Sequence, residues 1–140
     1  MRAFGTARSF GTLVLLLATI ACGEKPTPTE PAPVYEQKTE IYIGSVSTGG
    51  TTAFHFAVVN PGAINATITQ MAPISTLTMG LDLGSWDIVA STCSAQLKNS
   101  VVLNTVATGT PSQAGEYCVA VVDIGNVQST IDFTISVTHY

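Results

Sequence analysis

The chain has 140 residues, enough for one domain, and nine acidic residues outnumber five basic ones. Without Arg2 and Arg8, which lie in the leader described next, three lysines remain and the net charge is about minus six. This balance argues against nucleic acid and anionic lipid headgroups as electrostatic partners.

The first 21 residues are typical of a bacterial export signal. The two arginines provide a positive start, and the apolar run 12–21 that follows is too short to span a bilayer permanently. The run ends at Ala21-Cys22-Gly23, which resembles the processing box of bacterial lipoproteins, where the cysteine receives the lipid. We therefore predict a signal peptide at 1–21 and lipidation of Cys22, with an ordinary cleaved signal and a chance cysteine as the alternative.

The predicted localisation is the cell envelope. The residue after the lipid cysteine is Gly23 rather than Asp, so the inner-membrane retention signal of some Gram-negative lipoproteins is absent. We expect an exported protein that is held by its lipid at the outer membrane or cell surface. Residues 22–39 would be a disordered spacer, because four prolines between Lys25 and Val34 favour extended polyproline geometry.

The number of cysteines, three, agrees with an exported, lipid-anchored protein. If Cys22 carries lipid, Cys93 and Cys118 remain as one pair inside the domain. Export implies an oxidising compartment, so we predict that these two form a disulfide, with two buried free thiols as the alternative. The closed loop of about 25 residues would contribute roughly 3.5 kcal/mol on the chain-entropy model.

From residue 40 to residue 140 the sequence predicts an all-β domain. Alternation of apolar and polar residues marks strands near 41–43, 52–59, 64–69 and 77–83, and most clearly at 131–137. Further strands are expected at 86–93 and 101–107, with a loop at 109–115. Seven or eight short antiparallel strands give a β-sandwich, jelly-roll-like or immunoglobulin-like in layout.

The stretch 115–126 predicts the central strand. Cys118, Ala120, Val122 and Ile124 form one apolar face, with the cysteine expected to point into the protein, and Tyr117, Val119 and Val121 form the other. Strands that are apolar on both sides usually lie inside a sheet whose two faces are covered. The other strands are therefore expected to pack around this one.

The domain resembles a known family. The stretch Gly-Glu-Tyr-Cys-Val-Ala-Val-Val-Asp-Ile-Gly-Asn at 115–126, followed by 131–139, is similar to the end of bacterial pre-peptidase C-terminal (PPC)-like domains, and 54–58, 66–69 and 79–84 also fit. The resemblance implies an eight-stranded jelly-roll sandwich over residues 40–140. Members are often appended to secreted proteases, and related collagenase domains bind collagen and calcium. Because no catalytic domain is attached here, the accessory role to a protease is not implied.

The sequence does not predict an enzyme. The only histidines are His55, expected to face solvent, and His139, near the end of the last strand, and no serine lies in Gly-x-Ser-x-Gly. Calcium is the one cofactor considered, with Asp82 and Asp123 as weak candidate ligands, but the Asp-x-Asp-x-Asp-Gly pattern is absent. Asp123 is better explained as a turn residue that bonds its own backbone.

Trp86 is the candidate ligand-binding residue. A lone tryptophan on a β-sandwich can stack on a sugar ring, although core or edge packing, over the expected disulfide, is the simpler explanation. The leading hypothesis is a non-enzymatic, lipid-anchored binding or interaction module. The alternatives are a domain that binds polysaccharide or an extracellular matrix protein, and an assembly subunit whose Thr-rich final strand pairs with another chain.

Overall fold

The computed structural model describes residues 33–140, which form one compact unit. The predicted signal peptide, Cys22 and most of the spacer lie outside the described residues. Eight strands follow one another: β1 (Lys38–Val46), β2 (Thr51–Val58), β3 (Ile64–Ala72), β4 (Met79–Asp87), β5 (Thr92–Val101), β6 (Val106–Gly109), β7 (Gly115–Val122) and β8 (Ile131–His139). Within residues 33–140 no helix is long and apolar enough to span a membrane.

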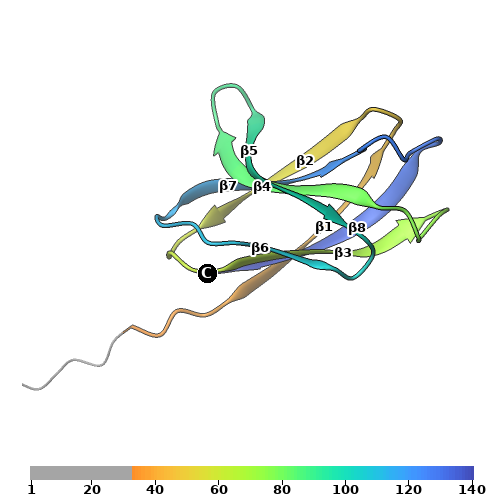
Figure 1. The fold of residues 1–140 in the computed structure, drawn as a ribbon. Helices are drawn as coiled ribbons and strands as arrows, with labels where there is room; N and C mark the ends of the chain where they lie inside the picture. Colours follow the sequence, from red (N-terminus) through yellow and green to blue (C-terminus); the bar gives the residue numbers. More distant parts are fainter. Residues whose placement is uncertain (1–32) are drawn as a thin grey trace, which may run out of the picture. The chain divides into compact units, whose positions relative to one another are not determined.

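The strands form two packed antiparallel sheets, seen as two layers in Figure 1. One sheet has the order β1-β8-β3-β6 and the other the order β2-β7-β4-β5. Consecutive strands therefore alternate between sheets in most steps, which is the double Greek-key arrangement of an eight-stranded jelly roll. The predicted jelly-roll-like sandwich is confirmed, and the immunoglobulin-like alternative is not the one adopted.

The core lies between the two sheets and is built from alternate residues of the longer strands. The inward side chains of β8 are the clearest case, with Ile131, Phe133, Ile135 and Val137 at most 2% exposed, as the sequence predicted. The facing sheet contributes Leu81 and Val119, both fully buried. Because all eight strands and this core lie within residues 33–140, the segment has what a domain needs to fold on its own.

The central strand is β7, but its two faces are the reverse of the expectation. β7 pairs with β2 on one side and β4 on the other, so it is an interior strand as predicted. Tyr117, Val119 and Val121 pack against the core, whereas Cys118 lies on the sheet's outer face. Cys118 is still fully buried, with its sulfur bonded to Cys93 of β5.

Two predicted strands are misplaced. The stretch 86–93 is not a strand, because β4 ends at Asp87 and a hairpin turn leads to β5 at Thr92. The stretch 101–107 also spans a turn, between the end of β5 and the start of β6 at Val106. In both places apolar residues continue through the turn, so hydrophobicity alone gives no sign of the break.

The last strand has no free edge. β8 pairs with β1 along one side and with β3 along the other. The assembly hypothesis placed a partner chain on β8, and that arrangement is wrong because both rows of backbone groups are already used. The edge strands of the two sheets are β1 and β6, and β2 and β5.

Candidate functional site

A trough of about 550 Å³ lies on the outer face of the sheet β2-β7-β4-β5. Its floor is made of small side chains, among them Ala53 of β2, Ala95 of β5 and Ala120 of β7. These small residues leave the sheet face low beside the larger side chains of Trp86 and Lys98, and the buried Asp82 also lies in the floor. The arrangement follows from the alternation of the four strands, which aims every second residue away from the core.

Trp86 forms an aromatic wall of the trough and is supported by His55, which stacks on it without lining the trough. The two rings stack with centroids 5.2 Å apart and planes 21° apart, across the sheet from β4 to β2. Trp86 is half-buried and His55 is exposed, so one part of the indole remains open to a ligand. A partly exposed aromatic ring held by a second ring is a rigid apolar platform.

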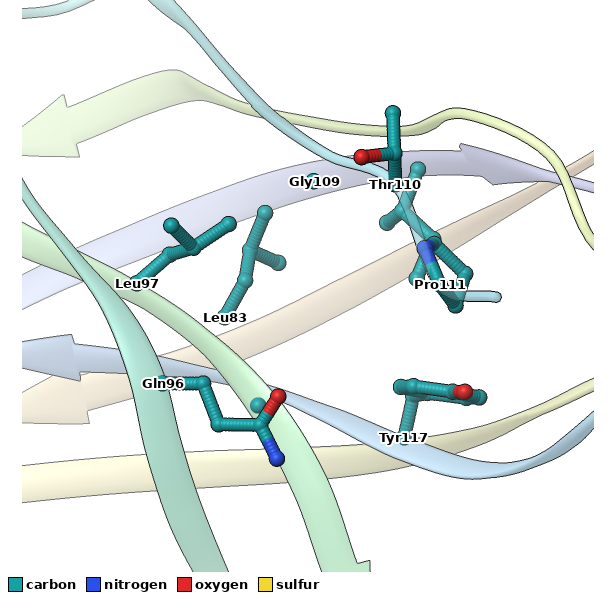
Figure 2. Close-up of a pocket in the computed structure, with 9 residues that line it drawn as sticks. Leu83, Gln96, Leu97, Gly109, Thr110, Pro111 and Tyr117 are labelled. Atoms are coloured by element: carbon teal, nitrogen blue, oxygen red, sulfur yellow. The ribbon is translucent and has the colours of Figure 1, made fainter. Parts of the chain in front are cut away.

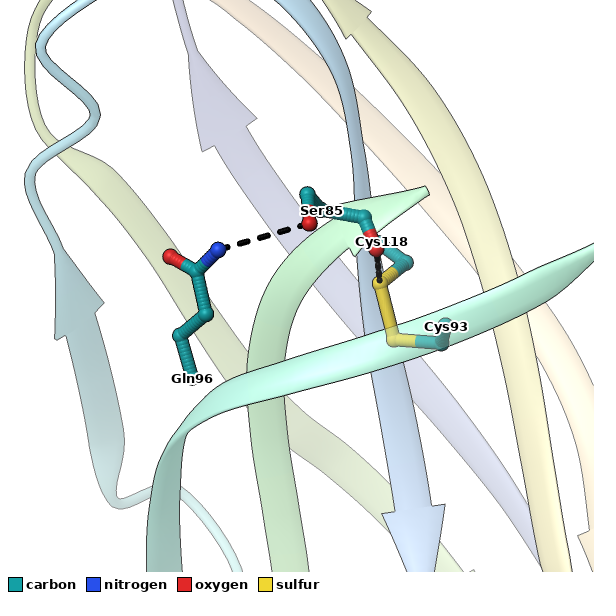
Figure 3. Close-up of a disulfide and its surroundings, with 4 residues drawn as sticks. All are labelled: Ser85, Cys93, Gln96 and Cys118. Carbon is teal, nitrogen blue, oxygen red and sulfur yellow. Dashed lines mark hydrogen bonds between the residues drawn. A yellow bond between two sulfur atoms is a disulfide. The ribbon is translucent and has the colours of Figure 1, made fainter. Parts of the chain in front are cut away.

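The disulfide predicted from the cysteine count joins Cys93 of β5 to Cys118 of β7, with Cα atoms 5.7 Å apart. Trp86 lies opposite Cys93 in the β4–β5 register, so the disulfide fixes the strand beside the platform. Figure 3 shows the bridge passing close to Ser85, whose carbonyl oxygen is 3.2 Å from the Cys118 sulfur. A Cβ on the neighbouring Gly84 would overlap the carbonyl of Ser94, so the strands approach this closely only because residue 84 is glycine.

Asp82 and Lys98 provide the charges of the trough. They are register partners on β4 and β5, and Asp82 is only 8% exposed. Burial raises the pKa of Asp82, while Lys98 and the backbone N–H of Asn99 act in the opposite direction. A carboxyl group that is partly desolvated beside a cation is a strong hydrogen-bonding group for a ligand that reaches the floor.

The two calcium candidates have different environments. Asp123 accepts backbone N–H groups from Gly49, Gly125, Asn126 and Val127 at 2.8–3.0 Å, so its oxygens serve the turn after β7, as its turn interpretation predicted. Asp82 alone lies in the trough. Within residues 33–140 no three His, Cys, Asp or Glu side chains gather as a metal site.

The two histidines do not share a site. His55 faces outward beside Trp86, whereas His139 is buried, stacks on Phe56 with centroids 5.0 Å apart and lies 3.5 Å from a Glu40 oxygen. Among the hydrogen bonds of residues 33–140, none joins a Ser or Thr hydroxyl to either ring.

Sequence reasoning found Trp86 and Asp82 but missed most of the trough. The small floor residues come from strands far apart in the chain, and an alanine in a strand carries no signal of its own. His55 was expected to face solvent, and it does, but its stacking on Trp86 depends on the β2-β7-β4 order.

Comparisons with known proteins give information about the fold only. The sequence matches no known family model and no curated protein. A solved structure is similar. It is that of the Yersinia pseudotuberculosis-derived mitogen (YPM), with a TM-score of 0.55 and 12% identity over 75% of this chain and 88% of that chain. At this identity the likeness concerns the β-rich architecture and carries no function across.

Proposed function

We propose that this chain is a non-enzymatic binding module, exported and anchored by a lipid on Cys22, that presents the trough of the β2-β7-β4-β5 sheet to a ligand. The observation that carries the proposal is that the trough holds both Trp86, which stacks on His55, and the buried Asp82. The lipoprotein-like box at Ala21-Cys22-Gly23, the proline-rich spacer and the disulfide support export to an oxidising compartment. The membrane is then a partner through the lipid.

The anchor is tested by metabolic labelling. Cells that express the chain would be grown with radioactive palmitate, and the label is expected on the wild type and absent from Cys22→Ala. The wild type should sediment with membranes, and density separation should place it with the outer membrane or at the cell surface. Label that persists in Cys22→Ala would contradict this part of the proposal.

The ligand class that the trough favours is carbohydrate, with an extracellular matrix protein as the alternative. Sugar rings present apolar C–H faces that stack on indole and hydroxyls that bond to carboxylates, and Trp86 and Asp82 supply both groups. Glycan and collagen arrays would compare the wild type with Trp86→Ala. Loss of the stacked side chain should weaken binding roughly tenfold or more.

The matched control is Ile88→Ala, in the same β4–β5 hairpin, where the isoleucine is 70% exposed and does not line the trough. This variant should bind like the wild type. Equal binding by Trp86→Ala and the wild type would remove the trough from the proposal, whatever the outcome for the lipid.

Calcium is tested separately by calorimetric titration at millimolar concentration. The proposal needs no cofactor, so no heat is expected. If heat is released, Asp82→Asn should abolish it, because Asp123 is already bonded by four backbone N–H groups. The proposal also keeps the resemblance to PPC-like domains, supported by the eight-stranded jelly-roll order and by fold analogy only.

Assembly remains the second candidate, now through β1 instead of β8. β1 is a nine-residue edge strand, and its outward Ile41 and Ile43 are 58% and 75% exposed. A long apolar edge strand is a template for strand pairing. Size-exclusion chromatography at several concentrations would reveal an assembly, and a single monomer peak at all concentrations would remove this candidate.

A further inference from the structure

A second cavity, which we call the edge slot, opens between the two sheets where the edge strands β5 and β6 meet. Its volume is about 290 Å³, and it is lined by Ile64, Leu83, Gly84, Gln96, Leu97, Gly109, Thr110, Pro111 and Tyr117. Figure 2 shows the two leucines on one side of it and Pro111 and Tyr117 on the other. None of these residues lines the trough, so the edge slot is a separate site.

The interior of the edge slot is apolar, and β6 approaches its two leucines closely at a glycine. Ile64 and Leu83 are 3% and 4% exposed and belong to the core, whereas Leu97 is 44% exposed. A Cβ on Gly109 would lie 3.3 Å from a terminal methyl of Leu83 and of Leu97. This approach is closer than an ordinary van der Waals contact, so a side chain at position 109 would press on both leucines of the lining.

The mouth of the edge slot carries hydrogen-bonding groups, and a β-bulge places one of them. Leu83 pairs with Leu97 but Gly84 pairs with Ala95, so Gln96 is the extra residue of β5. Bulges turn a side chain out of the regular alternation and are frequent beside binding sites. The Gln96 amide nitrogen donates to the Ser85 hydroxyl at 3.3 Å, which leaves the amide oxygen as an acceptor. The Thr110 hydroxyl is a second polar group of the lining.

We propose that the edge slot binds a small ring-shaped apolar molecule that carries one hydrogen-bonding substituent, such as a phenol. A volume of about 290 Å³ lies at the lower limit of ligand pockets, which suits a single substituted ring better than a drug-sized ligand. The ring would pack between the leucines and Tyr117, and its hydroxyl would donate to Gln96. This site does not depend on the lipid anchor or on the trough.

The test is a ¹H–¹⁵N NMR titration of residues 33–140 with p-cresol and with toluene, its analogue without a hydroxyl. We expect p-cresol to cause saturable shifts at the amides of Leu97, Gly109 and Thr110, with a Kd in roughly the millimolar range for so small a ligand. Toluene should bind about 2- to 10-fold more weakly, because the hydrogen bond is lost. Gln96→Leu should abolish this preference.

Filling the edge slot should abolish binding. Gly109→Val adds a side chain that presses Leu83 and Leu97 out of their places in the lining. If Gly109→Val does not fold, Leu97→Ala, which removes an exposed wall, should weaken p-cresol binding about threefold or more. The control is Val106→Ala, on β6 but facing solvent at 56% exposure, which should bind like the wild type. Trp86→Ala should also leave p-cresol binding unchanged.

Four results would overturn the proposal. They are shifts that do not saturate, shifts centred on the trough residues Ala53 and Ala120, binding that survives in Gly109→Val, and equal binding of toluene and p-cresol. Tighter binding of the peptide acetyl-Gly-Tyr-Gly-amide than of p-cresol would overturn the small-molecule assignment and give the edge slot to a protein side chain.

Discussion

The side chain of Asp123 stabilises two turns of the fold. Its carboxylate accepts four backbone N–H groups, from Gly49 in the β1–β2 turn and from Gly125, Asn126 and Val127 in the turn after β7. Gly125 has φ +98°, which a side chain would disfavour, so the turn needs both its glycine and its carboxylate. These hydrogen bonds, first of all the one from Gly49, hold the pKa of Asp123 below its usual value.

Asp123→Ala should lower the stability of the domain in a pH-dependent way. Because the folded-state pKa is below the unfolded value near 3.9, the contribution of Asp123 is present at neutral pH and is lost as the pH falls through the folded value. Urea unfolding from pH 7 to pH 3 should show the difference from wild type shrinking towards acid. Asp132→Ala, at an exposed position of β8, is the control, and a difference that is constant with pH would contradict the argument.

At the scale of single residues, the sequence predicted chemistry where the signal is local. The turn role of Asp123 needs only its neighbours Gly125 and Asn126, and the pairing of Cys93 with Cys118 needs only counting. The stacking of Trp86 on His55 could not be predicted in this way, because it depends on which strand lies between them.

The strands, too, were predicted correctly where the sequence signal is local and incorrectly where it is not. β2, β3 and β8 alternate regularly and lie where the sequence placed them, because one face of each packs on the core and the other meets solvent. Most of β5 was missed, with only its ends inside predicted strands, because it is an edge strand, largely exposed on both faces, and its bulge at Gln96 interrupts the period. β7 was predicted at the correct residues, but its two faces were exchanged. The reason is that Cys118, which is buried by its disulfide on the outer face, has the sequence pattern of a core residue.

Removal of the disulfide should destabilise the sandwich without changing its strand order. Cys93 and Cys118 close a loop with a sequence separation of 25, so the double variant Cys93→Ala/Cys118→Ala should lose about 3.5 kcal/mol of unfolding free energy. Guanidinium unfolding monitored by circular dichroism would measure this. The reduced wild type should match the variant, and a loss below about 1 kcal/mol would mean that the bridge adds little to the packing of β5 on its sheet.

The whole molecule depends on contacts between the sheets. Ile135 of β8 and Ile68 of β3 are fully buried from one sheet, as are Leu81 and Val119 from the other. The alternation predicts that such a core exists, but it does not say which strands are neighbours. The trough combines residues of β2, β4, β5 and β7, and the edge slot combines residues of β3 to β7. Neither site could therefore be predicted before the strand order was known.

Ile135→Ala should cost about 2–5 kcal/mol of unfolding free energy, because it leaves a cavity at the centre of the sandwich. Ile41→Ala makes the same chemical change on β1, where the side chain is 58% exposed, and should cost less than about 0.5 kcal/mol. Thermal and urea unfolding of both variants would check the contrast. Similar losses for the two would mean that Ile41 is covered, as an assembly through β1 would require.

The register of β1 against β8 has a practical consequence for engineering. Lys38 pairs with His139, so the chain enters and leaves the sandwich at neighbouring points, as Figure 1 also shows. A short glycine-serine bridge could therefore join these points, and new ends could be opened in the connection after β3, which holds the exposed Ile74. Such a circular permutant, or the sandwich spliced into a surface loop of a host protein, would present its trough in an orientation chosen by the designer.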